Sequence, residues 1–231
     1  MKKLFTVLNI LMVEAIVILV MLYSEFGGVE LKAATSSIFV ILSGINLVYA
    51  CLNKTDNLKY YIFMVAAFVI AMAGDVVLYF DFMVGAIIFA IGHIFYFVAY
   101  SIRTKIKLTD FIYSAAVFVP SALLILLEKS FDFGGALMQV ICLVYALIIS
   151  LMLGKAIANT TREFSMSNII ILIGSALFFL SDLMLLLCYF GNGGMLADII
   201  CLATYFPGQG LLAYSLFHIE NEKESEKKQI E

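Results

Sequence analysis

The chain alternates between long apolar stretches and short polar breaks. Each stretch is close to the roughly 20 residues that a helix needs to cross a bilayer. The breaks are so short that helices adjacent in sequence must run antiparallel. The pattern therefore predicts an all-α polytopic membrane bundle of eight transmembrane helices, over residues 4–22, 33–52, 60–80, 83–102, 110–127, 134–153, 167–190 and 195–216.

Lysine and arginine residues are distributed unevenly between the two sides of this bundle. If the N-terminus is cytoplasmic, twelve of them lie on the inner side and only Lys32 and Lys129 lie on the outer side. Such a bias sets the orientation of membrane proteins and predicts an N-in/C-in topology. We expect one transmembrane domain over residues 1–218 and a charged, solvated cytoplasmic tail over residues 219–231.

The composition agrees with a multi-pass membrane protein. Apolar residues make up 64% and charged residues 13% of the 231 residues, against about 45–50% and 25% in soluble domains. This excludes a secreted protein, a cytosolic enzyme and a single-span receptor. A net charge of −3 without a basic face excludes a nucleic-acid partner. We expect a bacterial-type inner or plasma membrane location with lipid as the surroundings; the oligomeric state stays open.

A few polar side chains fall inside the predicted spans, where a charge costs at least about 2.5–3.5 kcal/mol. At 1.5 Å per residue, Asp75 and Asp182 lie roughly 8 and 12 Å below the outer surface, and His93 lies at about 15 Å. These depths fit one cavity that opens outward. The candidates are Glu14, Asp75, His93, Asp182, Asp198 and Gln209.

Each polar residue also allows a structural interpretation. A single buried aspartate can bridge helices through Tyr or Ser, and His93 can be a packing residue. Glu14 either pairs with another helix or lines the cavity, and Asp198 is shallow enough to be solvated. Two carboxyl groups at similar depth, Asp75 and Asp182, each after a small residue, favour a polar site.

Two carboxyl groups in a membrane cavity suit acid–base chemistry. Burial and mutual repulsion keep one of them protonated near neutrality while the other stays ionised. That pair can donate a proton and stabilise an oxocarbenium-like cation, as hydrolysis of an acetal or a vinyl ether requires. No lysine lies deep enough for a retinal Schiff base, and no phosphate-binding glycine loop is present. We expect no cofactor and no metal; two histidines exclude a His-rich zinc site, although a carboxylate metal site stays open.

A weak internal repeat relates the two halves of the chain. AMAGDVVLYF (71–80) resembles FLSDLMLLLCYF (179–190), and FVAYSI (97–102) resembles LLAYSL (211–216). The halves are offset by four helices and would run in the same direction through the membrane. This pattern is compatible with a parallel repeat of two four-helix units.

Four short patches in the third to eighth helices resemble the YhhN-like family of eight-helix membrane proteins, which includes the lysoplasmalogenases. Their order and spacing are more specific than any one patch. The family often has Lys-Pro at the start of its second helix, whereas Ala33 follows Lys32 here. The patches are Gly74-Asp75 before an apolar run, His93 and Tyr96 in GAIIFAIGHIFYFVAY, Ser181-Asp182 in GSALFFLSDLML, and Tyr205 and Gln209 in TYFPGQGLLAYSL.

The resemblance implies a lysophospholipid substrate, whose 1-alkenyl ether is cleaved to a fatty aldehyde and a glycerophospho-amine. One of Asp75 and Asp182 would protonate the vinyl carbon and the other would stabilise the cation and orient water. The remaining candidates would hold the water and the headgroup; they are His93, Tyr96, Ser181, Tyr205, Gln209 and Glu14. Two alternatives stay open: a proton-coupled small-molecule transporter, and a lipid-binding membrane protein without turnover.

Overall fold

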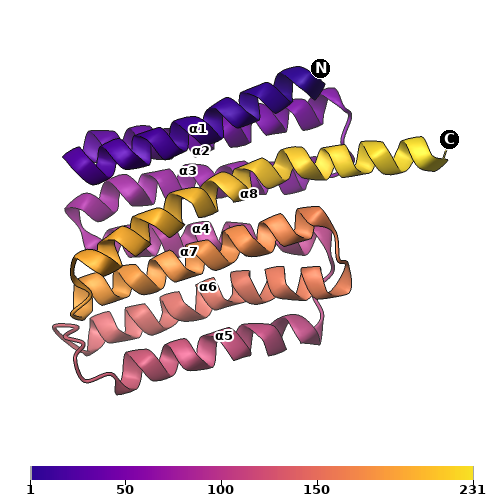
Figure 1. Ribbon diagram of the computed structural model, residues 1–231. Helices are drawn as coiled ribbons and strands as arrows, with labels where there is room; N and C mark the ends of the chain where they lie inside the picture. The colour runs from indigo at the N-terminus through magenta and orange to yellow at the C-terminus, as the bar shows by residue number, and fades with distance from the viewer. Residues whose placement is uncertain (1, 231) are drawn as a thin grey trace.

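The computed structural model describes the backbone of residues 2–230 and the side chains of residues 2–222. Within this part the fold is entirely helical, and each of the eight helices is long and apolar enough to cross a membrane. Figure 1 shows them lying side by side. The helices are α1 (Lys2–Phe26), α2 (Val29–Leu52), α3 (Leu58–Phe80), α4 (Phe82–Arg103), α5 (Leu108–Leu127), α6 (Ala136–Arg162), α7 (Met166–Phe190) and α8 (Gly194–Ile230).

Six helices form a closed ring, and two lie outside it. Around the ring, α2, α3, α4, α6, α7 and α8 each pack against the next, and α8 returns to α2. Outside the ring, α1 packs against α2 and α8, and α5 packs against α6 alone. Both termini lie at one end of the bundle (Figure 1), which we call the terminal end. The opposite end, where α3 meets α4 and α7 meets α8, we call the cavity end.

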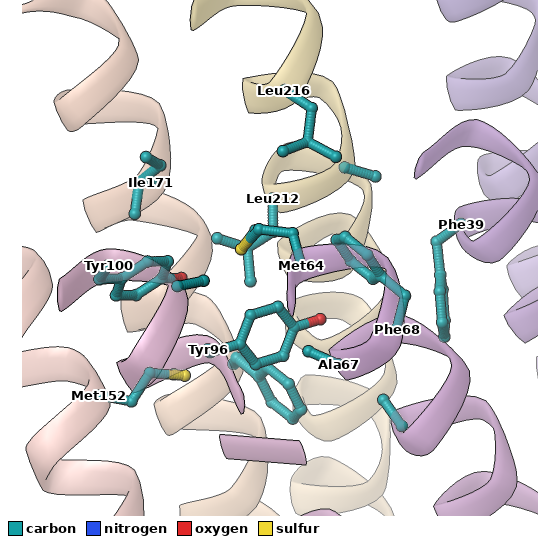
Figure 2. Packing of buried hydrophobic residues seen from close by; sticks show 14 of the residues in the cluster. Phe39, Met64, Ala67, Phe68, Tyr96, Tyr100, Met152, Ile171, Leu212 and Leu216 are labelled. Carbon is teal, nitrogen blue, oxygen red and sulfur yellow. The ribbon is translucent and has the colours of Figure 1, made fainter. Parts of the chain in front are cut away.

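The interior of the ring is filled by side chains in its terminal half. Tyr96, Tyr100, Phe68 and Met64 are fully or almost fully buried there, and Figure 2 shows them packed between the helices. The Phe68 and Tyr96 rings meet edge to face with centroids 5.5 Å apart, a favourable arrangement for aromatic pairs. This half of the ring is therefore a packed core.

Several helices are longer than predicted. In two of them, α6 and α2, the extra residues bring a lysine into the bundle. The helix predicted to end at residue 153 continues to Arg162 as α6. Lys155 is therefore buried, and its Nζ lies 2.8 Å from Oδ2 of Asp110 on α5, an ion pair that stabilises the extra turns. Similarly, α2 begins at Val29 and includes Lys32 in its first turn.

The last helix also exceeds its predicted length, because α8 continues to Ile230. The start of the predicted tail packs on the bundle: Ile219 and Glu220 are buried, and Tyr61 donates a 3.0 Å hydrogen bond to Oε2 of Glu220. The side chains after residue 222 lie outside the described residues. Pro207 lies inside α8 without ending it.

Candidate active site

A cavity of about 360 Å³ lies at the cavity end of the ring. Both predicted catalytic carboxyl groups, Asp75 on α3 and Asp182 on α7, line it. Lys32, Tyr205 and Asp198 contribute further polar groups to its wall. Helices distant in sequence therefore bring the two aspartates to the same open cavity, and Asp198, which lines it, is exposed.

Asp75 is held by donors from α2, which is adjacent in the ring, and from α8, which lies across it. Ser36 on α2 donates a 2.5 Å hydrogen bond to its Oδ2, and the Tyr205 hydroxyl on α8 donates a 2.7 Å bond to the same oxygen. The Lys32 ammonium lies 3.6 Å from Oδ1, and Asp75 is only 1% exposed. A buried carboxylate needs a counter-charge and hydrogen bonds, and these three groups supply both.

Asp182 is also contacted by polar side chains from two helices, but without a lysine or arginine. The Tyr145 hydroxyl on α6 donates a 2.6 Å hydrogen bond to its Oδ2. His93 on α4 places Nε2 3.1 Å from the same oxygen and 3.0 Å from the Tyr145 hydroxyl. The carboxyl group of Asp182 is 11% exposed, so it is more open to the cavity than Asp75.

The two carboxyl groups occupy equivalent places in the ring. Asp75 lies on α3 and accepts hydrogen bonds from α2 and α8. Asp182 lies on α7 and accepts from α6 and α4. Since α2, α3 and α8 correspond to α6, α7 and α4 when the chain is offset by four helices, this geometry supports the repeat suggested by the sequence.

An apolar cleft adjoins the cavity on the Asp182 side. Its volume is about 60 Å³, and α4, α5, α6 and α7 provide most of its wall, including Ser121, Cys142 and Tyr145. It exists because α5 packs against α6 alone and leaves a gap towards α4 and α7. Asp182 lines both the cleft and the cavity, and is the carboxyl group that they share.

The other residues named from the sequence fall into two groups. Ser181 and Tyr205 line the cavity, although the Ser181 hydroxyl donates to the Phe178 carbonyl 2.7 Å away. Tyr96 and Gln209 lie deeper in the aromatic core, where the Tyr96 hydroxyl donates a 2.7 Å hydrogen bond to Oε1 of Gln209. Of residues 205–209, only Tyr205 lines the cavity.

The structure does not bring Glu14 into this site. The buried face of α1 carries Phe5, Asn9 and Ile16, and Asn9 exchanges hydrogen bonds of 2.8 and 2.9 Å with Asn46 on α2. Glu14 lies on the opposite face, because two residues before Ile16 correspond to a rotation of about 200°. It is exposed at the middle of α1 and does not line the cavity.

Three residues that contact the carboxyl groups were missed from the sequence: Lys32, Ser36 and Tyr145. Lys32 and Ser36 are four residues apart and lie on one face of α2, a signal that becomes visible once α2 is known to begin before Lys32. Tyr145 carries no such signal, because it is one of 12 tyrosines in the chain and only the packing of α6 against α7 selects it.

The site holds polar groups suited to acid–base chemistry. No group of three or more His, Cys, Asp or Glu side chains that could hold a metal ion occurs in the described part of the chain. The two carboxyl groups contact hydroxyl, imidazole and ammonium groups.

Comparison with known proteins agrees with the resemblance seen in the motifs. No curated protein and no solved structure matches the chain significantly. A sequence model of the YhhN family matches residues 31–216, which is most of the chain and includes α2 to α7 and the membrane-crossing part of α8. On this match, the protein belongs to the YhhN family.

Proposed function

We propose that this protein is an intramembrane hydrolase that cleaves the vinyl ether bond of lysoplasmalogen-type lysophospholipids. The observation that carries the proposal is the position of Asp75 and Asp182 on one cavity, next to an apolar cleft. Membership of the YhhN family is consistent with this activity.

We base the roles of the two carboxyl groups on the groups around each of them. The Lys32 ammonium lies 3.6 Å from Oδ1 of Asp75 and offsets part of the cost of a negative charge there. Asp182 has no such cation, lines the apolar cleft and contacts His93, through which a proton can be exchanged. Asp182 is therefore the proton donor, and Asp75 is the anion that stabilises positive charge and activates water.

The reaction then proceeds without any other reagent than water. Asp182 gives its proton to the β-carbon of the vinyl ether, and the α-carbon becomes an oxocarbenium ion. Asp75 takes a proton from water as the water oxygen bonds to the α-carbon. The hemiacetal breaks its bond to the glycerol oxygen, which takes the proton from Asp75, while its own hydroxyl proton returns to Asp182. The products are a fatty aldehyde and a glycerophospho-amine with a free hydroxyl at the position of the former ether.

The substrate fits the division of the site into a polar and an apolar part. Lys32 and Asp198 on the polar wall carry charges opposite to those of the phosphate and the ammonium of an amine-containing headgroup. The apolar cleft can take the first methylene groups of the chain beside Asp182. The vinyl ether joins these two parts of the lipid, and would lie between the two carboxyl groups.

The same geometry favours a hydrolase over an alternating-access transporter. The cavity is lined by residues of the cavity end, such as Tyr23, Lys32 and Asp198. Between it and the terminal end lies the packed aromatic core with Tyr96 and Tyr100. A site that a packed core closes towards the terminal end suits a hydrolase, which needs access from one side of that core only.

The test is aldehyde release from a lysoplasmalogen by the purified protein in detergent or nanodiscs. We expect Asp182→Asn and Asp75→Asn each to lower turnover by about 10²- to 10⁴-fold, the usual contribution of a positioned acid or base. Asp56→Asn, a change at an exposed loop carboxylate, should leave the rate unchanged. Wild-type turnover in both folded variants would show the mechanism to be wrong, and solute flux into sealed vesicles without aldehyde release would favour the transporter.

A further inference from the structure

Glu14 is a charged residue in a position that the isolated chain does not explain. It is twelve residues from each end of α1, so it lies about 18 Å from either end of the helix. Its side chain is exposed and forms no hydrogen bond or ion pair among the described residues. Of the charged side chains described in residues 2–222, no other is exposed near the middle of a spanning helix.

A carboxyl group in this place is unfavourable when it faces lipid tails. The ionised form lacks a counter-charge, and the protonated form has a donor and an acceptor without partners. The glutamate side chain is too short to reach the headgroups from the centre of the helix. The surface around Glu14 must therefore be covered by a group that can hydrogen bond with it at the same depth.

The residues around Glu14 form a regular seam on the outer face of α1. They are spaced alternately by three and four residues, the repeat with which two helices pack along their length. All are exposed, and the face lies opposite the one that packs on α2 and α8. We call this set the α1 seam; it consists of Leu4, Val7, Leu11, Glu14, Ile18 and Met21.

The α1 seam is also separate from the cavity and from the region that matches the family. The YhhN family match begins at residue 31, so α1 lies outside the matched region. Figure 1 shows α1 at the edge of the bundle. Only the end of α1, at Tyr23 and Ser24, reaches the cavity. The middle of the helix is therefore available for a contact between molecules.

We infer that two copies of this protein associate through the α1 seam, with their Glu14 side chains hydrogen bonded to each other across a two-fold axis. Two copies inserted in the membrane with the same topology place their Glu14 side chains at the same depth. A different protein need not place a polar group at that depth. The apolar seam residues then meet their own counterparts.

A second copy supplies the hydrogen-bond partner that the Glu14 carboxyl group lacks. Two protonated carboxyl groups can each donate a hydrogen bond to the other, and a pair that shares one proton is joined by a single hydrogen bond. In neither case do two negative charges lie side by side in lipid. Polar residues at the centre of spanning helices stabilise helix pairs in this way. A glutamine in place of Glu14 retains a donor and an acceptor, whereas leucine has neither.

The test measures the oligomeric state of the full chain in lipid. Single-molecule subunit counting in vesicles gives this state over a range of protein-to-lipid ratios. We expect the wild type to be dimeric at high protein-to-lipid ratios and to dissociate only on strong dilution. Glu14→Leu should raise the dissociation constant by about 3- to 30-fold, the range expected for one interhelical hydrogen bond, and Glu14→Gln should restore most of the association. A wild type that stays monomeric at every ratio, or a Glu14→Leu variant that dimerises as tightly, would overturn the inference.

Disulfide trapping tests the geometry separately. With Cys51, which is exposed, replaced by alanine, we expect rapid oxidation to a covalent dimer for Leu11→Cys, Glu14→Cys and Ile18→Cys. Val13→Cys is the matched control, because Val13 is exposed on the same helix but lies about 100° away from Glu14. Equal trapping at Val13 would mean that the α1 seam is not the interface. A dimer that is trapped at none of these positions would place the contact elsewhere and would likewise contradict the proposal.

Discussion

The Asp75 and Asp182 halves of the site share one geometry and differ in the groups around it. In both, a carboxyl group on one helix is contacted by a polar side chain from one adjacent helix of the ring and by one from a helix across the ring. Asp75, however, has the ammonium of Lys32 beside it, whereas Asp182 has His93 and an apolar cleft. An approximate repeat can thus present two similar carboxyl groups, while the surrounding charge gives them different chemical roles.

The largest expected effect concerns a third buried carboxyl group, Asp110. Because it lies away from the cavity, it separates the effect of burying a carboxyl group from the effect of lining the site. It is paired with Lys155 and Arg162 at the terminal end. Asp110→Asn would leave Lys155 buried without its counter-charge, and should lower the free energy of unfolding by about 3–5 kcal/mol. Unfolding by SDS titration measures this. Turnover per folded molecule should not change, and a loss of turnover without a loss of stability would contradict this division.

Removing Lys32 makes the two halves more alike, because neither carboxyl group then has a cation beside it. Lys32→Met takes the cation from Asp75 and favours the protonated form of its carboxyl group, so kcat/KM should fall by about 10²-fold near neutral pH. Activity should recover partly as the pH is raised, because Asp75 then ionises again. The pH profile of aldehyde release is the measurement, with Lys129→Met at the exposed loop as the control. A profile that keeps its wild-type shape would remove Lys32 from this role.

The two tyrosines test the equivalence of the halves. Tyr205→Phe and Tyr145→Phe each remove one hydroxyl that donates to a carboxyl group. A hydrogen bond to a charged group contributes about 1.5–3 kcal/mol, so Tyr205→Phe should lower kcat by at least about tenfold. We expect a smaller loss for Tyr145→Phe, because His93 still contacts the same oxygen of Asp182. Single-turnover rates separate the two, and a larger loss for Tyr145→Phe would reverse the assignment of the acid.

The smallest effect is expected in the apolar cleft, which only the Asp182 half possesses. Ser121→Phe on α5 fills part of the cleft and should lower kcat/KM for long alkenyl chains by about tenfold relative to short ones. Val119→Phe, at an exposed position of the same helix, is the control. Equal losses for long and short chains would mean that the chain does not enter there.

Sequence patterns predicted the fold well because each span is long and apolar, and because the lysines and arginines alternate between sides. They also predicted that Asp75 and Asp182 lie at similar depth, which follows from counting residues along two helices. The direction in which a side chain points depends on the rotation of its helix, which neighbouring helices decide. Glu14 was therefore expected in the cavity or in a pair and lies on the outer face of α1, and Tyr145 could not be chosen among the tyrosines.

The attachment of α5 to α6 alone has a consequence for enzyme kinetics. A lipid that reaches Asp182 through the gap beside α5 arrives sideways from the bilayer and never dissolves in water. The relevant substrate concentration is then its mole fraction in the membrane. Rates should follow surface dilution with inert lipid and should be insensitive to the total amount of membrane at a fixed mole fraction.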